Sequence, residues 1–269
     1  MIEQSAIISA LGVRRDFDAA HEIARRVEFL KTYLVDSRQT AYVLGISGGV
    51  DSLAAGLLAQ RAVRELREDG RTATFIAVRL PYGVQADERD AAEAVAVIRP
   101  DRILTVDIKP AADSLMAAVL AGGSEPVLRH HFILGNVKAR QRMVAQYAIA
   151  GTASGLVIGT DHAAEALMGF YTKFGDGAAD VLPLAGLNKR RVRAVAAALG
   201  APDRLVWKVP TADLESDAPL RPDEEVYGVT YDQIDDFLEG KAVEPAAAER
   251  ILSAYKASAH KRALPVPAG

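Results

Sequence analysis

The sequence changes character abruptly around residue 46, where an apolar segment gives way to serines and glycines. Residues 41–46 read AYVLGI, residues 47–52 read SGGVDS, and residues 52–69 carry apolar side chains at helical spacing up to Gly70. A short apolar run bounded by loop residues is typical of a buried parallel strand. A strand, a glycine-rich turn and a helix in this order predict an α/β protein with a ligand-binding loop at the carboxyl end of that strand.

Further strands and helices alternate along the chain in the same way. Strands are predicted at 73–81, 102–108 and 155–160, and helices at 18–36, 89–98, 136–151 and 188–200. This alternation predicts a Rossmann-like, doubly wound parallel sheet. The proline-rich acidic segment 210–225 predicts a mobile loop, and residues 230–240 and 246–262 predict a helical C-terminal tail. We expect residues 1–269 to form a single domain.

Composition excludes several kinds of chemistry. The 269 residues include no cysteine, which rules out disulfides, thiolate metal sites and cysteine nucleophiles within the chain. The net charge of -3 provides no basic surface for nucleic acid, so no nucleic-acid partner is expected. No apolar run approaches the ~18 residues of a membrane span, and the N-terminal residues do not follow the signal-peptide pattern. We therefore expect no membrane association and a cytoplasmic protein.

The SGGVDS string has the properties of a phosphate-binding loop. The N-terminus of a helix carries unpaired N–H groups and a partial positive charge, and glycines let a ligand approach the backbone closely. The string contains no lysine, which distinguishes it from the Walker motif. Asp51 would face phosphate oxygens through a bridging Mg²⁺ ion. The alternative is that Asp51 or Ser47 simply caps the helix.

The string resembles the signature of the PP-loop ATP pyrophosphatases, a family that cleaves ATP between its α- and β-phosphates. Longer segments are similar to ammonia-dependent NAD synthetases, among them GNVKARQRM (135–143), GTDHAAEALMGFYTKFGDGAADVLPL (159–184), PTADLESD (210–217) and HKR (260–262). The resemblance runs from about residue 20 to residue 262. It implies an adenine nucleotide alpha hydrolase-like fold and ATP-dependent amidation of deamido-NAD⁺ by ammonia. The products would be NAD⁺, AMP and pyrophosphate, formed through an adenylated carboxylate in the last step of NAD⁺ biosynthesis.

The resemblance implies one set of residues for ATP and for magnesium. Asp51 and Glu165 match the two metal carboxylates of the family. Without the motif, Glu165 would be interpreted as an exposed helix acid, and Lys189 as one charge in the solvated run 189–191. The ATP-binding residues implied are Gly45, Ile46, Ser47, Gly48, Gly49, Val50, Asp51, Ser52, Thr160, Lys189 and Thr211.

A second set of residues is implied for the dinucleotide and for ammonia. His260 and Lys261 match residues that the family contributes from a partner subunit, which implies a homodimer with the dinucleotide site at the subunit interface. The alternative is that they form a basic helix end. Asp176 is the candidate base that takes a proton from ammonium, unless it only shapes a turn. The residues implied for deamido-NAD⁺ are Arg140, Lys173, Asp180, His260 and Lys261.

Other functions remain open from the sequence. A glutamine-dependent synthetase would need a glutaminase domain with a cysteine nucleophile, and the sequence has no cysteine. A PP-loop enzyme that modifies tRNA is a second alternative, although its RNA substrate favours a basic surface. The third alternative is a non-catalytic nucleotide sensor, which we would expect to lack Asp51 or Glu165.

Overall fold

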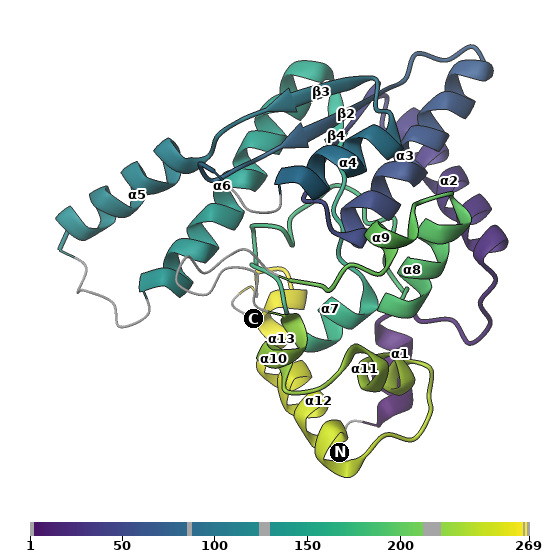
Figure 1. Ribbon diagram of the computed structural model, residues 1–269, viewed down its shortest axis with the longest axis vertical. Helices are drawn as coiled ribbons and strands as arrows, with labels where there is room; N and C mark the ends of the chain where they lie inside the picture. The colour runs from purple at the N-terminus through teal and green to yellow at the C-terminus, as the bar shows by residue number, and fades with distance from the viewer. Residues whose placement is uncertain (1–2, 85–87, 124–129, 212–221, 266, 268–269) are drawn as a thin grey trace.

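The computed structural model describes residues 3–84, 88–123, 130–211, 222–265 and 267, and its centre is a parallel β-sheet (Figure 1). Within these residues the strand order is β3-β2-β1-β4, and all three pairings are parallel. The strands are β1 (Ala41–Gly45), β2 (Thr74–Arg79), β3 (Arg102–Thr105) and β4 (Gly155–Val157). The predicted parallel sheet is confirmed. The strand predicted at 155–160 is shorter than expected, because Ile158 forms only a single bridge to Val181.

Alternating side chains of the strands fill two separate apolar layers. Tyr42 and Leu44 of β1 pack with helices on one face, whereas Val43 packs on the opposite face. The first face is covered by α2 (Ala19–Asp36), α3 (Val50–Glu68) and α8 (Lys189–Ala198), and the second by α6 (His130–Ala153). Helices therefore cover both faces of the sheet, and the prediction of a doubly wound α/β fold is confirmed.

A third apolar core holds a helical region beside the sheet, where Figure 1 also places the chain termini. Its members are α1 (Gln4–Ala10), α7 (Ala163–Met168), α11 (Tyr231–Leu238) and α12 (Pro245–Ala257). The helical C-terminal tail is thus confirmed, joined by two helices from earlier in the chain. The single helix predicted at 246–262 is wrong in one respect, because Ser258 separates α12 from α13 (Ala259–Arg262). The Ser258 hydroxyl donates to the carbonyl of Ala254, an interaction that competes with regular helix geometry.

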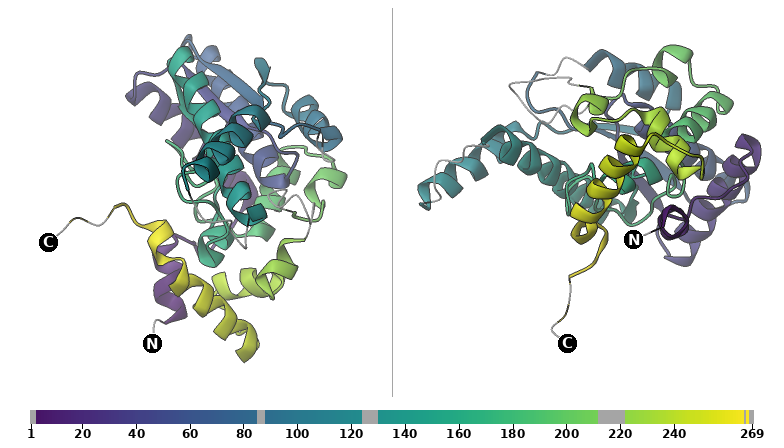
Figure 2. Two further views of the ribbon diagram at one scale, coloured as in Figure 1. Left: turned by 90° about the vertical axis from the view of Figure 1, so that its left-hand side faces the viewer. Right: turned by 90° about the horizontal axis from the view of Figure 1, so that it is seen from below.

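Two helices project from the body of the molecule, as Figure 1 and the right-hand view of Figure 2 show, whereas in the left-hand view of Figure 2 they point toward the viewer. They are α5 (Lys109–Ala121), which the sequence analysis missed, and the first half of α6, which begins six residues earlier than predicted. The remaining helices are α4 (Glu88–Ile98), α9 (Asp203–Val206) and α10 (Asp223–Tyr227). Most of the loop expected at 210–225 lies outside the described residues. Among the described helices, none combines the length and apolarity that crossing a bilayer requires.

Candidate active site

The SGGVDS loop connects β1 to α3 as predicted, and its serines shape it from within. The hydroxyls of Ser47 and Ser52 lie 3.2 Å apart, and the Ser52 hydroxyl donates to the carbonyl of Gly49 at 3.1 Å. Gly49 is the N-cap of α3, and no side chain caps this helix. The alternative that Asp51 or Ser47 caps α3 is therefore wrong. The first N–H groups of α3 remain available for a phosphate, which is the arrangement that binds anions at helix N-termini.

Gly48 is the position of this loop with the least tolerance for a side chain. Its φ of +82° is left-handed, and a Cβ atom there would lie 2.6 Å from the backbone nitrogen of Ala91. We expect Gly48→Ala to lower the free energy of unfolding by about 2 kcal/mol or more, since both strain and overlap are imposed. Urea unfolding followed by circular dichroism measures this change. Gly49→Ala is the matched control, because Gly49 has a φ of -80° and its added Cβ would meet nothing closer than 3.4 Å. Equal stability of the two variants would contradict the argument.

A cavity of about 300 Å³ opens beside this loop and gathers residues from distant parts of the chain. Its lining includes Thr160 after β4, Glu165 of α7, Asp176, Lys189 of α8 and Thr211. Every residue predicted to bind ATP except Gly48 lines the cavity, as do both predicted metal carboxylates: Gly45, Ile46, Ser47, Gly49, Val50, Asp51, Ser52, Thr160, Glu165, Lys189 and Thr211. The structure therefore places these residues around one space. Their individual roles remain predictions.

Four charged or ionisable groups meet at one end of the cavity. The ammonium of Lys189 donates to Asp51 Oδ2 at 2.7 Å, and His162 Nε2 lies 3.4 Å from Asp51 Oδ1 and 3.6 Å from Glu165 Oε1. The side chains of Lys189 and His162 are almost completely buried. Asp51 Oδ1 and His162 Nε2 are both buried without a hydrogen-bond partner. A cluster with such unsatisfied polar atoms in a cavity is suited to receive a charged ligand.

Burial and the charges of neighbouring groups shift the pKa values of these groups, and the two effects often oppose each other. Burial opposes ionisation of Asp51, but Lys189 and His162 outweigh it and lower the pKa of Asp51. Burial raises the pKa of Glu165, and the negative charge of Asp51 raises it further. Burial disfavours the charged form of Lys189, but Asp51 and Glu165 raise the pKa of that ammonium above its ordinary value. Asp51 and Lys189 therefore form an ion pair, beside which a second negative charge on Glu165 is not fully compensated.

The residues at this end of the cavity fit a magnesium ion. Asp51, His162 and Glu165 each place one potential ligand atom within 4.8 Å of the others. Mg²⁺ prefers oxygen ligands and typically takes one or two carboxylates plus phosphate oxygens. The carboxylates of Asp51 and Glu165 supply such oxygens beside the phosphate loop, and a divalent cation would compensate the charge of both. Asp51 and Glu165 would accordingly hold the ion.

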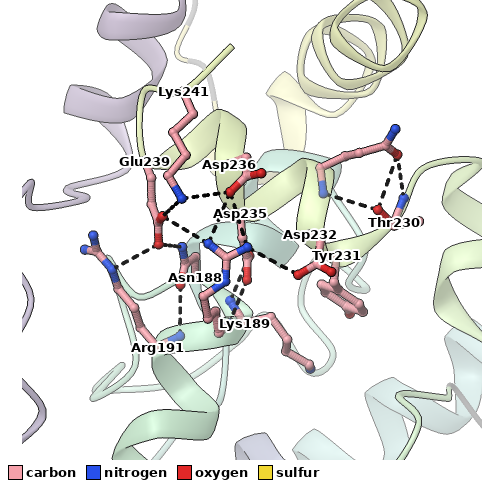
Figure 3. Close-up of polar contacts among 12 residues, drawn as sticks. Asn188, Lys189, Arg191, Thr230, Tyr231, Asp232, Asp235, Asp236, Glu239 and Lys241 are labelled. Carbon is pink, nitrogen blue, oxygen red and sulfur yellow. Dashed lines mark hydrogen bonds and ion pairs between the residues drawn. The ribbon is translucent and has the colours of Figure 1, made fainter. Parts of the chain in front are cut away.

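An acidic helix fixes the position of Lys189 (Figure 3). Asn188 caps α8, and its amide also donates to Glu239 at 2.9 Å. Asp235 of α11 accepts the backbone N–H groups of Lys189 and Arg190 at 3.1 and 2.7 Å. A carboxylate at a helix N-terminus is stabilised by the helix dipole. This contact anchors the first turn of α8, from which the Lys189 side chain reaches Asp51.

Asp176 lies on a tight loop that opens into the same cavity. Its Oδ1 accepts the backbone N–H of Thr172 at 2.9 Å, and the residue is exposed to solvent and lines the cavity. Burial by the surrounding protein raises the pKa of this carboxyl, despite that hydrogen bond and the nearby charge of Lys261. Asp161 is close enough for Asp176 to contribute, after burial, to raising the pKa of Asp161 to about 7. A carboxyl group with a raised pKa in a cavity is a candidate for proton transfer.

The residues predicted for the dinucleotide do not line this cavity. Lys173 Nζ donates to the carbonyls of His260 and Ala263 at 2.6 and 2.8 Å, and Arg140 donates to the carbonyl of Lys173 at 3.2 Å. Lys261 also bonds to backbone carbonyls of its own chain. Asp180 accepts the N–H of Val157 at 2.7 Å. The structure thus brings Arg140, Lys173, His260 and Lys261 together, and their role in binding a dinucleotide remains a prediction.

Several residues in the cavity were not found from the sequence. Arg142 and Lys208 line the cavity and His162 is buried beside it, yet no spacing rule distinguishes these three from ordinary surface or core residues. Asp223 is buried, lines the cavity and accepts the Tyr231 hydroxyl at 2.9 Å. The only sequence signal for Asp223 was its place in an acidic segment. These residues can be assigned to the cavity only from the fold, which brings their segments together.

Comparisons with known proteins agree on one family. The family model described as NAD synthase matches residues 22–265. An NH(3)-dependent NAD(+) synthetase from Burkholderia lata is 62% identical over 264 residues, covering 97% of this chain and 94% of that protein. The crystal structure of NAD+ synthetase from Burkholderia pseudomallei is 57% identical with a TM-score of 0.84, covering 97% of this chain and 96% of that one. The structure of NMN synthetase from Francisella tularensis is 35% identical with a TM-score of 0.82, covering 94% and 99%.

Proposed function

The chain belongs to the NAD synthase family, and we infer that it uses ATP and ammonia to amidate deamido-NAD⁺, giving NAD⁺, AMP and pyrophosphate. It is a ligase that forms a carbon–nitrogen bond in the last step of NAD⁺ biosynthesis. The observation that carries the reaction is the cavity where the uncapped N-terminus of α3 meets Asp51, Glu165 and Lys189. We propose one NAD synthetase domain for residues 1–269.

The first half of the reaction makes the nicotinate carboxylate reactive. A carboxylate is a poor electrophile, and ammonia does not displace oxide from it. A carboxylate oxygen of deamido-NAD⁺ attacks the α-phosphorus of ATP, the bond from that phosphorus to the bridging oxygen breaks, and pyrophosphate leaves. The product is a mixed anhydride with AMP. The N–H groups of α3 and the ammonium of Lys189 face the departing phosphates, where they stabilise the charge that develops.

Magnesium, when held by Asp51 and Glu165, supplies positive charge that allows an anionic carboxylate to approach an anionic triphosphate. Lys189 and His162 orient the two carboxylates that would hold the ion. Lys189 binds Oδ2 of Asp51, and Oδ1 of the same carboxylate, which lies 3.4 Å from His162 Nε2, makes no hydrogen bond within the protein. His162 caps α7 through Nδ1 and thereby sets the position of Glu165 in the first turn of that helix. Both carboxylates are in this way oriented before substrate binds.

The second half of the reaction forms the amide. The nitrogen lone pair of ammonia attacks the carbonyl carbon of the anhydride, the bond from that carbon to the oxygen of AMP breaks, and the nitrogen releases one proton to water as the amide forms. The ammonium ion that predominates near neutral pH has no lone pair, so a proton must be removed first. We propose that Asp176 binds ammonium in the cavity and accepts this proton. Its raised pKa makes the Asp176 carboxylate a stronger base than an ordinary carboxylate, which favours transfer of the proton from ammonium.

The reaction is tested by exchange of labelled pyrophosphate into ATP. Exchange that requires deamido-NAD⁺, followed by amide formation when ammonium is added, is the expected result. Nicotinate mononucleotide, the acid corresponding to NMN, is the matched competitor for the dinucleotide. A nucleotide sensor would bind ATP without exchange, and an enzyme that modifies tRNA would not respond to either nicotinate compound. Exchange without any nicotinate compound, or cleavage of ATP to ADP, would contradict the proposed reaction.

We propose that two chains form a homodimer through the projecting helices. Large apolar side chains on α5 and α6 are exposed, and β3, an edge strand of the described sheet, has exposed residues of its own. Several exposed apolar side chains on neighbouring helices are typical of an interface. The exposed apolar residues are Ile103, Leu115, Val119, Leu120, Phe132, Ile133 and Val144. Light scattering should give twice the chain mass of 28.7 kDa, whereas the mass of one chain would contradict this proposal.

A further inference from the structure

The ammonium of Lys189 lies against an aromatic ring as well as against Asp51. Its Nζ is 4.9 Å from the centre of the Tyr231 ring, within the ~6 Å over which an aromatic face attracts a cation. The two side chains come from the neighbouring helices α8 and α11 (Figure 3). Both residues are almost completely buried, so the attraction is stronger than at an exposed site.

Hydrogen bonds to two carboxylates of α10 fix Tyr231 in place. Its backbone N–H donates to Glu224 Oε1 at 2.7 Å, and its hydroxyl donates to Asp223 Oδ2 at 2.9 Å. Because a phenol has only one proton, the Tyr227 hydroxyl, 3.3 Å from that of Tyr231, must donate to it. Burial raises the pKa of Tyr231 well above its ordinary value, which keeps this proton on the ring. The ring is therefore held in one position beside Lys189.

Two further rings support this position from the side of the cavity. The ring centres of Tyr231 and Tyr227 are 5.6 Å apart at an interplanar angle of 78°, and those of Tyr227 and Phe170 are 4.8 Å apart at 86°. Edge-to-face contacts of this kind are favoured by the charge distribution of the rings. Phe170 and Asp223 both line the cavity. The aromatic cluster thus connects the cavity wall to the ring beside Lys189.

Asp51 alone is poorly suited to hold the Lys189 ammonium during the reaction. Among the described residues, Asp51 is the one hydrogen-bond acceptor of this ammonium, at 2.7 Å. The same carboxylate would bind magnesium, and its negative charge repels a triphosphate. An aromatic face attracts the ammonium but carries no net charge, so it does not repel the phosphates that the ammonium must also bind. The ring can therefore hold the ammonium at the cavity wall when Asp51 binds a metal.

We propose that Tyr231 is a positioning residue for adenylylation, and that its ring directs the Lys189 ammonium toward the phosphates that leave as pyrophosphate. Asp223 and Tyr227 act through Tyr231 by fixing its hydroxyl. The proposal rests on the proposed function of Lys189 in binding ATP. It assigns to the ring an electrostatic effect, which a residue that only fills space would not have.

Fluorination of the ring tests this role, because fluorine withdraws charge from the aromatic face while changing the size of the ring little. Tyr231→Phe and its mono-, di- and trifluorinated derivatives are compared by pyrophosphate exchange at subsaturating ATP. We expect the rate to fall about threefold with each fluorine, or about thirtyfold over the series, which is the effect of losing a buried cation–π contact. The same series at Tyr42, equally buried with its hydroxyl bonded to the carbonyl of Leu30 at 2.7 Å, is the matched control and should not depend on fluorine. A Tyr231 series that does not depend on the number of fluorines would overturn the proposal.

The same series in Lys189→Met separates the proposal from its premise. Methionine removes the cation, so the dependence on fluorine at Tyr231 should disappear. Dependence that persisted without the lysine would show that the ring acts on another group, and would overturn the proposal. Exchange at the unmodified rate in Lys189→Met with Tyr231 intact would refute the function of Lys189 itself. Strongly reduced exchange in Lys189→Met, combined with no dependence on fluorine when Lys189 is present, would refute the role of Tyr231 alone.

Discussion

Replacing Asp51 with Asn should abolish adenylylation while leaving the chain folded. Asp51 is the one carboxylate that contacts Lys189, faces His162 and lies in the first turn of α3 beside the uncapped N-terminus. Asparagine keeps the size of the side chain but removes the charge that would hold a cation between substrate and phosphates. We expect pyrophosphate exchange to fall by about 10³-fold or more, the scale of a lost electrostatic contribution to catalysis.

The fold should survive this change because Glu165 can take over part of the charge. Asp51 raises the pKa of Glu165, so its removal favours ionisation of Glu165 beside Lys189 and His162. The free energy of unfolding should therefore change by less than about 2 kcal/mol, below the cost of a buried cation left without any partner. Urea unfolding measures this change. Glu68→Gln, at an exposed position on the same helix, is the control for both measurements. Exchange within tenfold of the unmodified rate would refute the assignment of Asp51.

The sheet and the phosphate loop were predictable because their signals are local. Apolar runs such as 41–46 and the glycines at 48 and 49 follow from backbone geometry and from the period of each element. The predicted boundaries of β1, α2, α3 and α8 agree with the structure to within two residues. α5 was missed although Pro110 stands in its first turn, because several of its apolar residues are exposed and produce no one-sided pattern.

The composition of the site was only partly predictable. The family resemblance supplied Asp51, Glu165 and Lys189, and the structure places all three around one cavity. No residue pattern indicates that His162 would face two carboxylates or that Asp223 would be buried beside them, because these contacts join segments far apart in the chain. The hydrogen bonds that Lys173 and Lys261 donate to backbone carbonyls could not be predicted either, because every residue has such an acceptor.

Asp176→Asn should depress amidation by about 10² to 10⁴-fold and leave adenylylation nearly intact, the range for loss of a general base. The variant separates the two interpretations of this residue. Asparagine still offers Oδ1 to the N–H of Thr172, so the turn keeps its hydrogen bond and a purely structural residue would lose little. It carries no charge for ammonium and has no basic oxygen for the proton. Only the catalytic interpretation therefore predicts a large effect.

The pH dependence of amidation gives an independent measure of the same group. Burial raises the pKa of Asp176, so its basic form is lost at a higher pH than for an ordinary carboxyl group as the solution becomes more acidic. In the unmodified enzyme, amidation at a fixed concentration of ammonium should be level above this raised pKa and should fall as the pH falls through it, because the carboxylate form both binds ammonium and takes its proton. In Asp176→Asn the level region should disappear, because the rate then follows the concentration of free ammonia, which increases steadily with pH. The level region should persist in Asp69→Asn at the exposed end of α3. Quenched-flow measurement of amide formation after the adenylate has accumulated isolates this step from the first. If the level region persisted in Asp176→Asn, another group, with Asp161 as a candidate, would have to remove the proton.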